Sequence, residues 1–403
     1  MPAMSSPALA VLRRLPIRRA LLPAAVVAIT LVAGACARTQ SPPPEDPASK
    51  MLPATTSTPF VYVGGYRPEI RIFRLDRESG ALAPAGQVDG GNEPSFLAWD
   101  PDKRFLFAVN EVEAGRVVSF AIDPATGGLR RVGQASSAGN GPAHLSVDAS
   151  GRWVLVANYA GEDPGTIGVL PITADGGLGE AVFRHDFGPN TMPHMIRTGP
   201  QNAFVFVPCK GGPYVAQFAF DPRTGQLAPA AQERVASAPD AGPRHLDFHP
   251  NGRFAYVINE TNMTLSAYTL DAQSGALTEI ETVSTLPPDE KPAEGYSTAD
   301  VHVHPSGEFL YGSNRGHNSL VIYRIDTTTG RLTLVGHERR TIARPRNFHL
   351  DPAGGLLLVA NQDEANVSIF FIDRKTGSLE LAGEPTPAGE KPSFVGVVEL
   401  PGR

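Results

Sequence analysis

The sequence lacks most of the features that identify common classes of binding protein and enzyme. Its 403 residues contain only two cysteines, Cys36 and Cys209, and its 35 basic and 41 acidic residues are interspersed rather than collected in blocks. This pattern disfavours a nucleic-acid partner, which would require a concentrated basic face. No HExxH, Gly-x-Ser-x-Gly, phosphate-loop or Cys-x-x-Cys motif is present. We therefore expect neither a serine nucleophile nor a metal site, and no cofactor.

The N-terminal region has the pattern of an export signal. Basic residues precede an apolar stretch, 21–32, that is too short to span a bilayer unaided. We predict a signal peptide over residues 1–35, and the small residues 33–35 followed by Cys36 resemble the lipidation site of bacterial lipoproteins. Residues 36–59 are rich in proline, serine and threonine, which predicts a tether. These features predict an exported protein, either periplasmic or anchored to a membrane only through a lipid on Cys36.

The remaining chain, 60–403, repeats one short unit. The motif Asp-x-x-Thr/Ser-Gly-x-Leu, with one weaker copy at Gly176, recurs about every 50 residues. Its glycines are Gly80, Gly127, Gly176, Gly225, Gly275, Gly330 and Gly377. Short alternating apolar runs separated by turns fill each unit, without helical periodicity.

Units of this length with four short strands are typical of β-propeller blades. The spacing predicts an all-β fold with seven blades of four antiparallel strands. We expect the N-terminal strand at 60–63 and the C-terminal strand at 394–397 to complete one blade together and so close the ring.

A second motif, usually Pro-x-His/Phe/Asn, keeps the same spacing, and the copy near Ala299 and Asp300 lacks the proline. Because first and second strands are antiparallel, the start of one and the end of the next should lie on the same face of the disc. This places a polar cluster at one rim of the central channel, which is the default position for a binding site. His249, His304 and His349 lie near the opposite ends of first strands, and we expect them to bond turn backbone. The thiol of Cys209 is expected to be buried and structural.

The stretch from Gly242 to Glu260, reading GPRHLDFHPNGRFAYVINE, resembles the bacterial 6-phosphogluconolactonase family of seven-bladed propeller lactonases. The resemblance extends over essentially all of the predicted propeller, including the segments 310–315 and 344–348. It implies a hydrolase that opens small-molecule lactones, as part of carbohydrate metabolism, and we expect a monomer. The catalytic residues that the resemblance implies are His194, Arg244, Glu260 and Arg315, and the expected substrate contacts are His144, His245, Lys210, Asn314 and Arg346.

Lactone hydrolysis needs a deprotonated water and positive charge where the carbonyl oxygen becomes an oxyanion. His194 is predicted as general base or acid and Glu260 as its partner or as the alternative base, and the sequence does not decide between them. Arg244 and Arg315 suit carbonyl, carboxylate or phosphate oxygens. A phosphorylated sugar lactone is a cytosolic metabolite, so export favours a sugar or organic-acid lactone without phosphate. Two other hypotheses are a non-enzymatic exported propeller that binds a protein or envelope ligand, and a cycloisomerase acting on muconate-type diacids.

Overall fold

The computed structural model describes residues 58–400, which form twenty-nine β-strands and no helix. Within this range no helix has the length and hydropathy that crossing a bilayer would require. The predicted signal peptide, the predicted lipidation site Cys36 and the segment 36–57 lie outside the described residues. The first strand begins at Thr58, two residues before the predicted start of the propeller.

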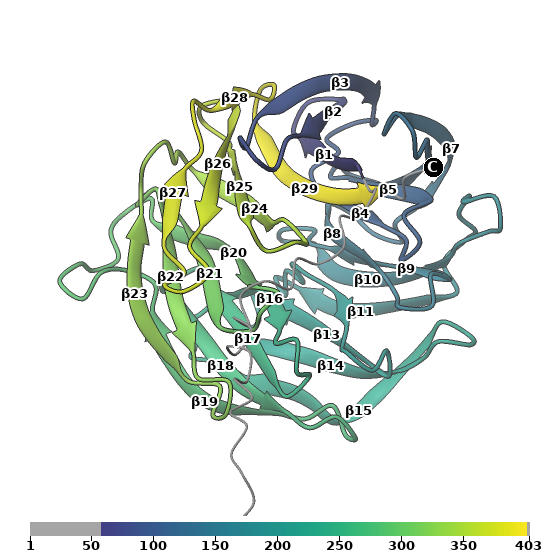
Figure 1. Cartoon of the computed structure of the whole chain (residues 1–403). Helices are drawn as coiled ribbons and strands as arrows, with labels where there is room; N and C mark the ends of the chain where they lie inside the picture. The colour runs from purple at the N-terminus through teal and green to yellow at the C-terminus, as the bar shows by residue number, and fades with distance from the viewer. Residues whose placement is uncertain (1–57, 401–403) are drawn as a thin grey trace, which may run out of the picture. The chain divides into compact units, whose positions relative to one another are not determined.

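The strands form seven sheets arranged around a ring (Figure 1), which we call blades 1 to 7. Blade 1 contains β29 (Pro392–Leu400), β1 (Thr58–Gly65), β2 (Glu69–Leu75) and β3 (Leu82–Asp89). Blade 2 contains β4 (Leu97–Trp99), β5 (Phe105–Asn110), β6 (Arg116–Ile122) and β7 (Leu129–Ser136). Blade 3 contains β8 (Pro142–Val147), β9 (Trp153–Asn158), β10 (Pro164–Pro171) and β11 (Phe183–Pro189).

The other four blades follow in chain order. Blade 4 contains β12 (Arg197–Thr198), β13 (Phe204–Cys209), β14 (Tyr214–Asp221) and β15 (Gln226–Ala236). Blade 5 contains β16 (Pro243–Phe248), β17 (Phe254–Asn259), β18 (Thr264–Leu270) and β19 (Leu277–Ser284). Blade 6 contains β20 (Ser297–Val303), β21 (Phe309–Arg315), β22 (Ser319–Ile325) and β23 (Leu332–Glu338). Blade 7 contains β24 (Pro345–Leu350), β25 (Leu356–Asn361), β26 (Asn366–Ile372), β27 (Leu379–Leu381) and β28 (Thr386–Pro387).

The predicted seven-bladed propeller is confirmed, and the ring closes as expected. The C-terminal strand β29 pairs antiparallel with β1 over eight partners, from Thr58 with Leu400 to Gly65 with Pro392. In Figure 1 the yellow β29 lies beside the purple β1, although they come from opposite ends of the chain. Because β29 is the innermost strand of blade 1, the first and last parts of the chain share one sheet and leave no unpaired edge between them.

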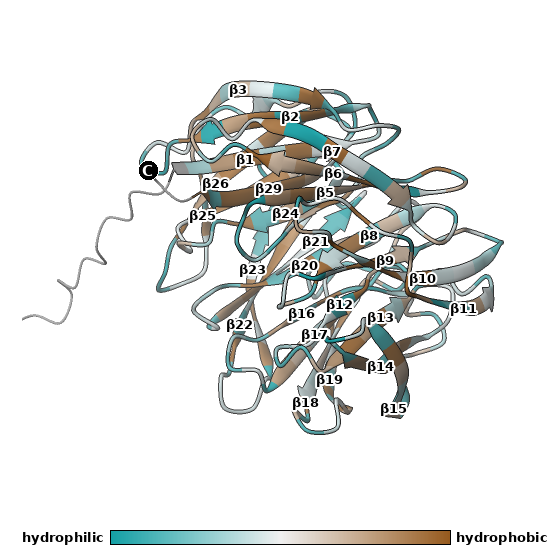
Figure 2. Cartoon of the chain, turned by 90° about the vertical axis from the view of Figure 1, so that its right-hand side faces the viewer, coloured by the Kyte–Doolittle hydropathy of each residue, from teal (hydrophilic) through white to brown (hydrophobic). Residues whose placement is uncertain are grey.

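Apolar side chains pack between neighbouring blades. The second strands β5, β9, β17 and β25 are buried along their whole length, whereas the outer strand β3 is mostly exposed. In Figure 2 the hydrophobic colouring is accordingly strongest in strands such as β29 and weaker in β15. A second strand packed on both faces reads as a continuous apolar run, while an outer strand with one wet face keeps polar residues.

The repeated glycine turn of each blade packs against the preceding blade. Gly377 has φ near +75°, and a Cβ atom there would lie 2.4 Å from a ring carbon of Phe309 in the preceding blade. The carboxylate of Asp373 accepts hydrogen bonds from the backbone N–H groups of Lys375 and Thr376 and so holds the turn. The motif therefore combines an Asx turn with a position where only glycine fits, which explains why it recurs once per blade.

Candidate active site

The innermost and second strands bring the predicted polar residues to one rim of the channel. In blade 5, Pro243 at the start of β16 pairs with Asn259 at the end of β17, which places Arg244 and Glu260 next to each other. The pairing register of β16 shifts between Pro243 and His245. Because of this β-bulge, the consecutive residues Arg244 and His245 lie in different layers of the channel wall. Comparable shifts occur at the starts of β8 and β24.

Glu260 is the centre of the cluster. Its Oε1 lies 2.9 Å from Nζ of Lys210 and 3.1 Å from Nη2 of Arg315, and its Oε2 lies 3.0 Å from Nε of Arg244. These cations come from blades 4, 6 and 5, and both arginine side chains are buried. The glutamate side chain is 12% exposed, so the group stays within reach of a ligand at the rim.

The cations determine the protonation of Glu260. Burial alone would raise its pKa, but Arg315, Arg244 and Lys210 outweigh this effect and hold the pKa at about 2. Burial and the neighbouring Arg315 and Arg346 lower the pKa of Arg244 to about 9. Glu260 is therefore a carboxylate at neutral pH and a weak base, because its negative charge is shared by three cations.

His194 lies beside this cluster as a neutral imidazole. Its ring packs edge-on against Tyr159, at 5.4 Å between centroids, and against His245, at 5.3 Å. Burial, with the positive charge of Arg244, lowers the pKa of His194 well below its ordinary value. Its Nδ1 is buried and has no hydrogen-bond partner among residues 58–400. His194 is therefore unprotonated at neutral pH, with one ring nitrogen that no group in residues 58–400 engages.

A second carboxylate lies on the same rim and was not among the predicted site residues. The hydroxyl of Tyr66 donates to Oε2 of Glu111 at 3.2 Å, and Nη2 of Arg346 lies 4.0 Å from Oε1 of the same side chain. The guanidinium of Arg346 also stacks over the Tyr66 ring. The signal was available in the sequence, since Glu111 follows Asn110 at the end of a second strand just as Glu260 follows Asn259.

The other predicted contacts are divided between the rim and the interior. Lys210 binds Glu260, and its Nζ lies 3.2 Å from the hydroxyl of Tyr159, another residue at the end of a second strand to which no role was assigned from the sequence. His144 and His245 are buried one layer deeper, and their rings lie 5.6 Å apart. Asn314 is not brought to Glu260: its side chain is fully buried and donates to the carbonyl of Thr285.

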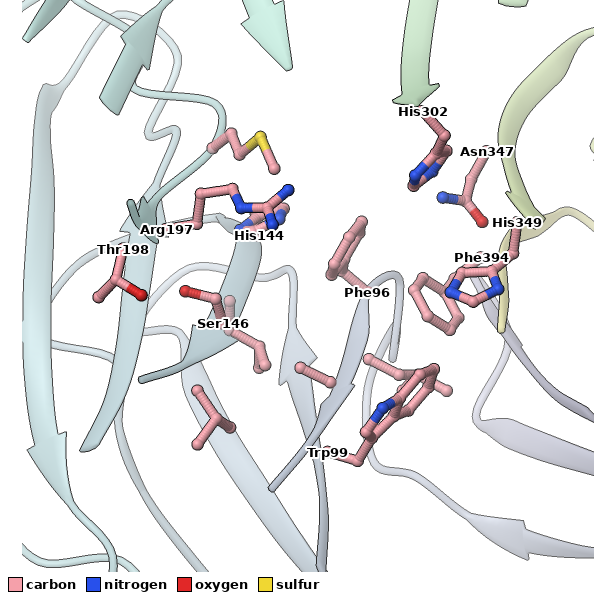
Figure 3. A pocket seen from close by; sticks show the side chains of 15 residues that line it. Phe96, Trp99, His144, Ser146, Arg197, Thr198, His302, Asn347, His349 and Phe394 are labelled. Carbon is pink, nitrogen blue, oxygen red and sulfur yellow. The ribbon is translucent and has the colours of Figure 1, made fainter. Parts of the chain in front are cut away.

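Below these histidines the channel opens into a cavity of about 250 Å³ that Glu260 does not line. Figure 3 shows Arg197, Thr198 and Ser146 on one side and His302, Asn347 and His349 on the other. Between Arg244, Arg346 and Glu111, by contrast, the free volume is about 10 Å³, close to that of one water.

Two of the three histidines expected to bond turn backbone do so. His249 and His304 contact the carbonyls of Gly307 and Gly354 at 2.8 and 2.9 Å. For His349 the expectation was wrong, because this residue lines the channel cavity. His349 lies two residues before the turn position, where blade 7 has Asp351, so it stands within β24 beside the channel and its Nδ1 accepts a hydrogen bond from the Val397 N–H of β29 at 3.4 Å.

Cys209 is fully buried, as predicted, and burial raises the pKa of its thiol. Residues 58–400 contain no group of three or more His, Cys, Asp or Glu side chains arranged to hold a metal ion.

Comparison with known proteins agrees with the seven-bladed fold. The family model described as "Lactonase, 7-bladed beta-propeller" matches residues 60–396. The 6-phosphogluconolactonase of Pectobacterium carotovorum is 34% identical over 285 residues, covering 70% of this chain and 80% of the relative. That of Serratia proteamaculans is 32% identical over 290 residues, covering 72% and 84%. The solved periplasmic gluconolactonase of Pseudomonas aeruginosa superposes with a TM-score of 0.79 at 28% identity, covering 86% of this chain and all of that one.

Proposed function

The chain belongs to the seven-bladed β-propeller lactonase family, and we propose that it is a carboxylic ester hydrolase that opens a sugar lactone by adding water. The observation that carries the proposal is the grouping of Glu260 with three cations beside a neutral His194. A lactone is a cyclic ester, so its hydrolysis needs both halves of this arrangement: positive charge for the oxyanion and an unprotonated base for the water.

The cations are suited to the carbonyl oxygen. Three cations share one carboxylate in a largely buried setting, which leaves the cluster with net positive charge. Arg244 and Arg315 are held by the backbone carbonyls of Ala299 and Thr298, so their guanidinium groups are oriented before a substrate arrives. Fixed donors of this kind stabilise developing negative charge without reorganising during the reaction.

We assign the base to His194 and an organising role to Glu260. Both oxygens of Glu260 are engaged by cations, whereas His194 is neutral and its Nδ1 has no partner among residues 58–400. In the reaction, His194 takes a proton from water as the hydroxide adds to the carbonyl carbon. The tetrahedral intermediate then expels the ring oxygen, which receives the proton from His194, and the product is a hydroxy acid.

We further propose that the substrate carries no phosphate and that the protein is exported. Two observations support this. The similar Pseudomonas aeruginosa structure is described as a periplasmic gluconolactonase, and the sequence of residues 1–35 has the pattern of an export signal. The 6-phosphogluconolactonase relatives make the phosphorylated lactone the necessary comparison substrate.

The test is acid release at constant pH from gluconolactone, 6-phosphogluconolactone and an aliphatic lactone. We expect Arg315→Ala to lower kcat/KM about 100-fold, in line with the loss of one oxyanion donor. Arg197→Ala is the matched control, because Arg197 lies on an innermost strand beside the channel cavity and pairs with Asp247 instead. A folded protein that hydrolyses no lactone above the spontaneous rate would refute the enzyme, and cyclisation of muconates would replace it with the cycloisomerase.

A further inference from the structure

Each blade contributes one residue to a layer of side chains in the channel beneath the rim. These residues follow the repeated Pro-x motif, and we call them the plug layer: Phe96, His144, Met195, His245, Asp300, Asn347 and Phe394. Contacts run across the channel axis as well as around it. The ring of Phe96 in blade 2, for example, lies 6.0 Å from that of His245 in blade 5 and 4.9 Å from that of Phe394 in blade 1.

Asp300 is the single acidic member of the plug layer and stands where the repeated motif loses its proline. Its Oδ1 lies 2.7 Å from Nδ1 of His245, and its Oδ2 accepts a hydrogen bond from the Asn347 amide at 2.5 Å. Nε2 of His302, in the channel cavity, lies 3.1 Å from the same Oδ2. With 3% of its surface exposed, Asp300 is a buried carboxylate with partners from three blades.

The protonation states follow from these contacts. Burial would raise the pKa of Asp300, but His302 and His245 keep it well below its ordinary value, so the group is ionised. Burial and Arg244 lower the pKa of His245 to about 4, so this ring carries one proton at neutral pH. A carboxylate can only accept a hydrogen bond, and the proton of His245 must therefore sit on Nδ1.

This tautomer determines how the His245 ring contacts Arg244 at the rim above. With the proton on Nδ1, Nε2 of His245 is an acceptor, and it lies 3.3 Å from Nη1 of Arg244. The same Nη1 donates to the carbonyl of Ala299, and Nε of Arg244 faces Glu260. The opposite tautomer would place an N–H against the guanidinium, so that two donors would face each other in a buried site.

We propose that Asp300 is a positioning residue: by holding the proton of His245 on Nδ1, it makes Nε2 an acceptor that orients the Arg244 guanidinium toward Glu260 and the substrate. The effect on turnover rests on the proposed lactonase function, whereas the tautomer itself does not. Asp300 touches no substrate and acts through His245 and Arg244.

The first experiment reads the tautomer directly by nitrogen-15 NMR of the protein labelled on its histidines. His245→Gln identifies the His245 signals by their loss. We expect a protonated Nδ1 and an unprotonated Nε2 in the wild type. In Asp300→Asn, a donor N–H₂ replaces one of the two acceptor oxygens. The Asn347 amide needs the remaining oxygen as its acceptor, so the N–H₂ is left facing Nδ1 of His245. We therefore expect the His245 proton to move to Nε2. A wild-type proton on Nε2, or an unchanged pattern in Asp300→Asn, would overturn the proposal.

The second experiment asks whether Asp300 acts through Arg244. Asp300→Asn should lower kcat/KM for the lactone 10- to 100-fold in the wild type but less than 2-fold in an Arg244→Ala background, because the group it positions is then missing. Asp247→Asn is the matched control: Asp247 is a carboxylate of the next channel layer that bonds Arg197 and the Val303 N–H, and its Oδ2 lies 4.0 Å from Nδ1 of His302, the nitrogen that does not contact Asp300. Equal losses from Asp300→Asn in both backgrounds, or equal losses from Asp300→Asn and Asp247→Asn, would contradict the assignment. If no lactone is hydrolysed, the NMR result still decides the tautomer.

Discussion

Replacing Glu260 by glutamine tests the electrostatics of the cluster. The change keeps the shape of the side chain but leaves Lys210, Arg244 and Arg315 without their shared counter-charge. The difference between the native pKa of about 2 and the ordinary glutamate value of 4.5 corresponds to about 3 kcal/mol of stabilisation of the folded state at neutral pH. For a domain of this size that loss should lower the thermal midpoint by about 4 °C.

The stabilisation by Glu260 depends on pH in a direction that its lowered pKa determines. Because the native pKa of Glu260 lies below the unfolded value, its stabilisation is complete above about pH 5 and is lost as the pH falls toward about 2. The difference in midpoint between wild type and Glu260→Gln should therefore be largest at neutral pH and shrink in acid. Calorimetry or circular dichroism at several pH values between about 3 and 7 measures it.

Two variants separate this effect from that of an ordinary ion pair. The Glu338 side chain is 10% exposed, close to the 12% of Glu260, but it pairs with one exposed arginine, Arg340. Its other partners are two backbone N–H groups, for which glutamine keeps an acceptor oxygen, so Glu338→Gln should cost less than about 1 kcal/mol. Lys210→Met removes one of the crowded cations, and Glu260→Gln should cost less in that background than alone. The reasoning fails if Glu260→Gln and Glu338→Gln are equally stable at pH 7, or if their difference grows as the pH is lowered.

Three further outcomes follow from the structure. Because the pKa of His194 lies well below its ordinary 6.5, kcat/KM for a lactone, corrected for spontaneous hydrolysis, should hold its value as the pH falls through 6.5 and decline only in more acidic solution; an inflection near 6.5 would remove His194 as the base. Gly377→Ala should lower the free energy of unfolding, measured by urea titration, by about 3 kcal/mol, because its φ is near +75° and the new Cβ meets Phe309. In the control Gly336→Ala the new Cβ has no atom within 4 Å, so the free energy of unfolding should change by less than about 0.5 kcal/mol. Deleting residues 391–403 removes the inner strand of blade 1 and should abolish the monodisperse folded species in gel filtration; a compact, active product would show that the ring does not depend on β29.

The fold was predictable because the signals that specify it are local. A turn such as Asp373 to Gly377 needs an Asx side chain and a glycine at fixed positions, so its recurrence reveals the number of blades. The antiparallel order of neighbouring strands likewise assigned Arg244 and Glu260 to one rim from their places at the start of one strand and the end of the next. Both inferences use contacts within one blade.

The contacts between blades were decided only by the tertiary structure. Three features depend on how neighbouring blades face one another around the axis. They are the contacts of Glu260 with cations of blades 4, 5 and 6, its low pKa, and the hydrogen bond between Asp300 and His245. Local patterns did not distinguish His349, which lines the cavity, from His249 in its turn, because one step of two residues along the strand separates the two environments. The sequence by itself determined the repeat, the blade count and the polar rim, since these rest on backbone conformation and alternation. Closure of the ring decided which charges meet, because residues about 50 positions apart come into contact only when every blade has its neighbours.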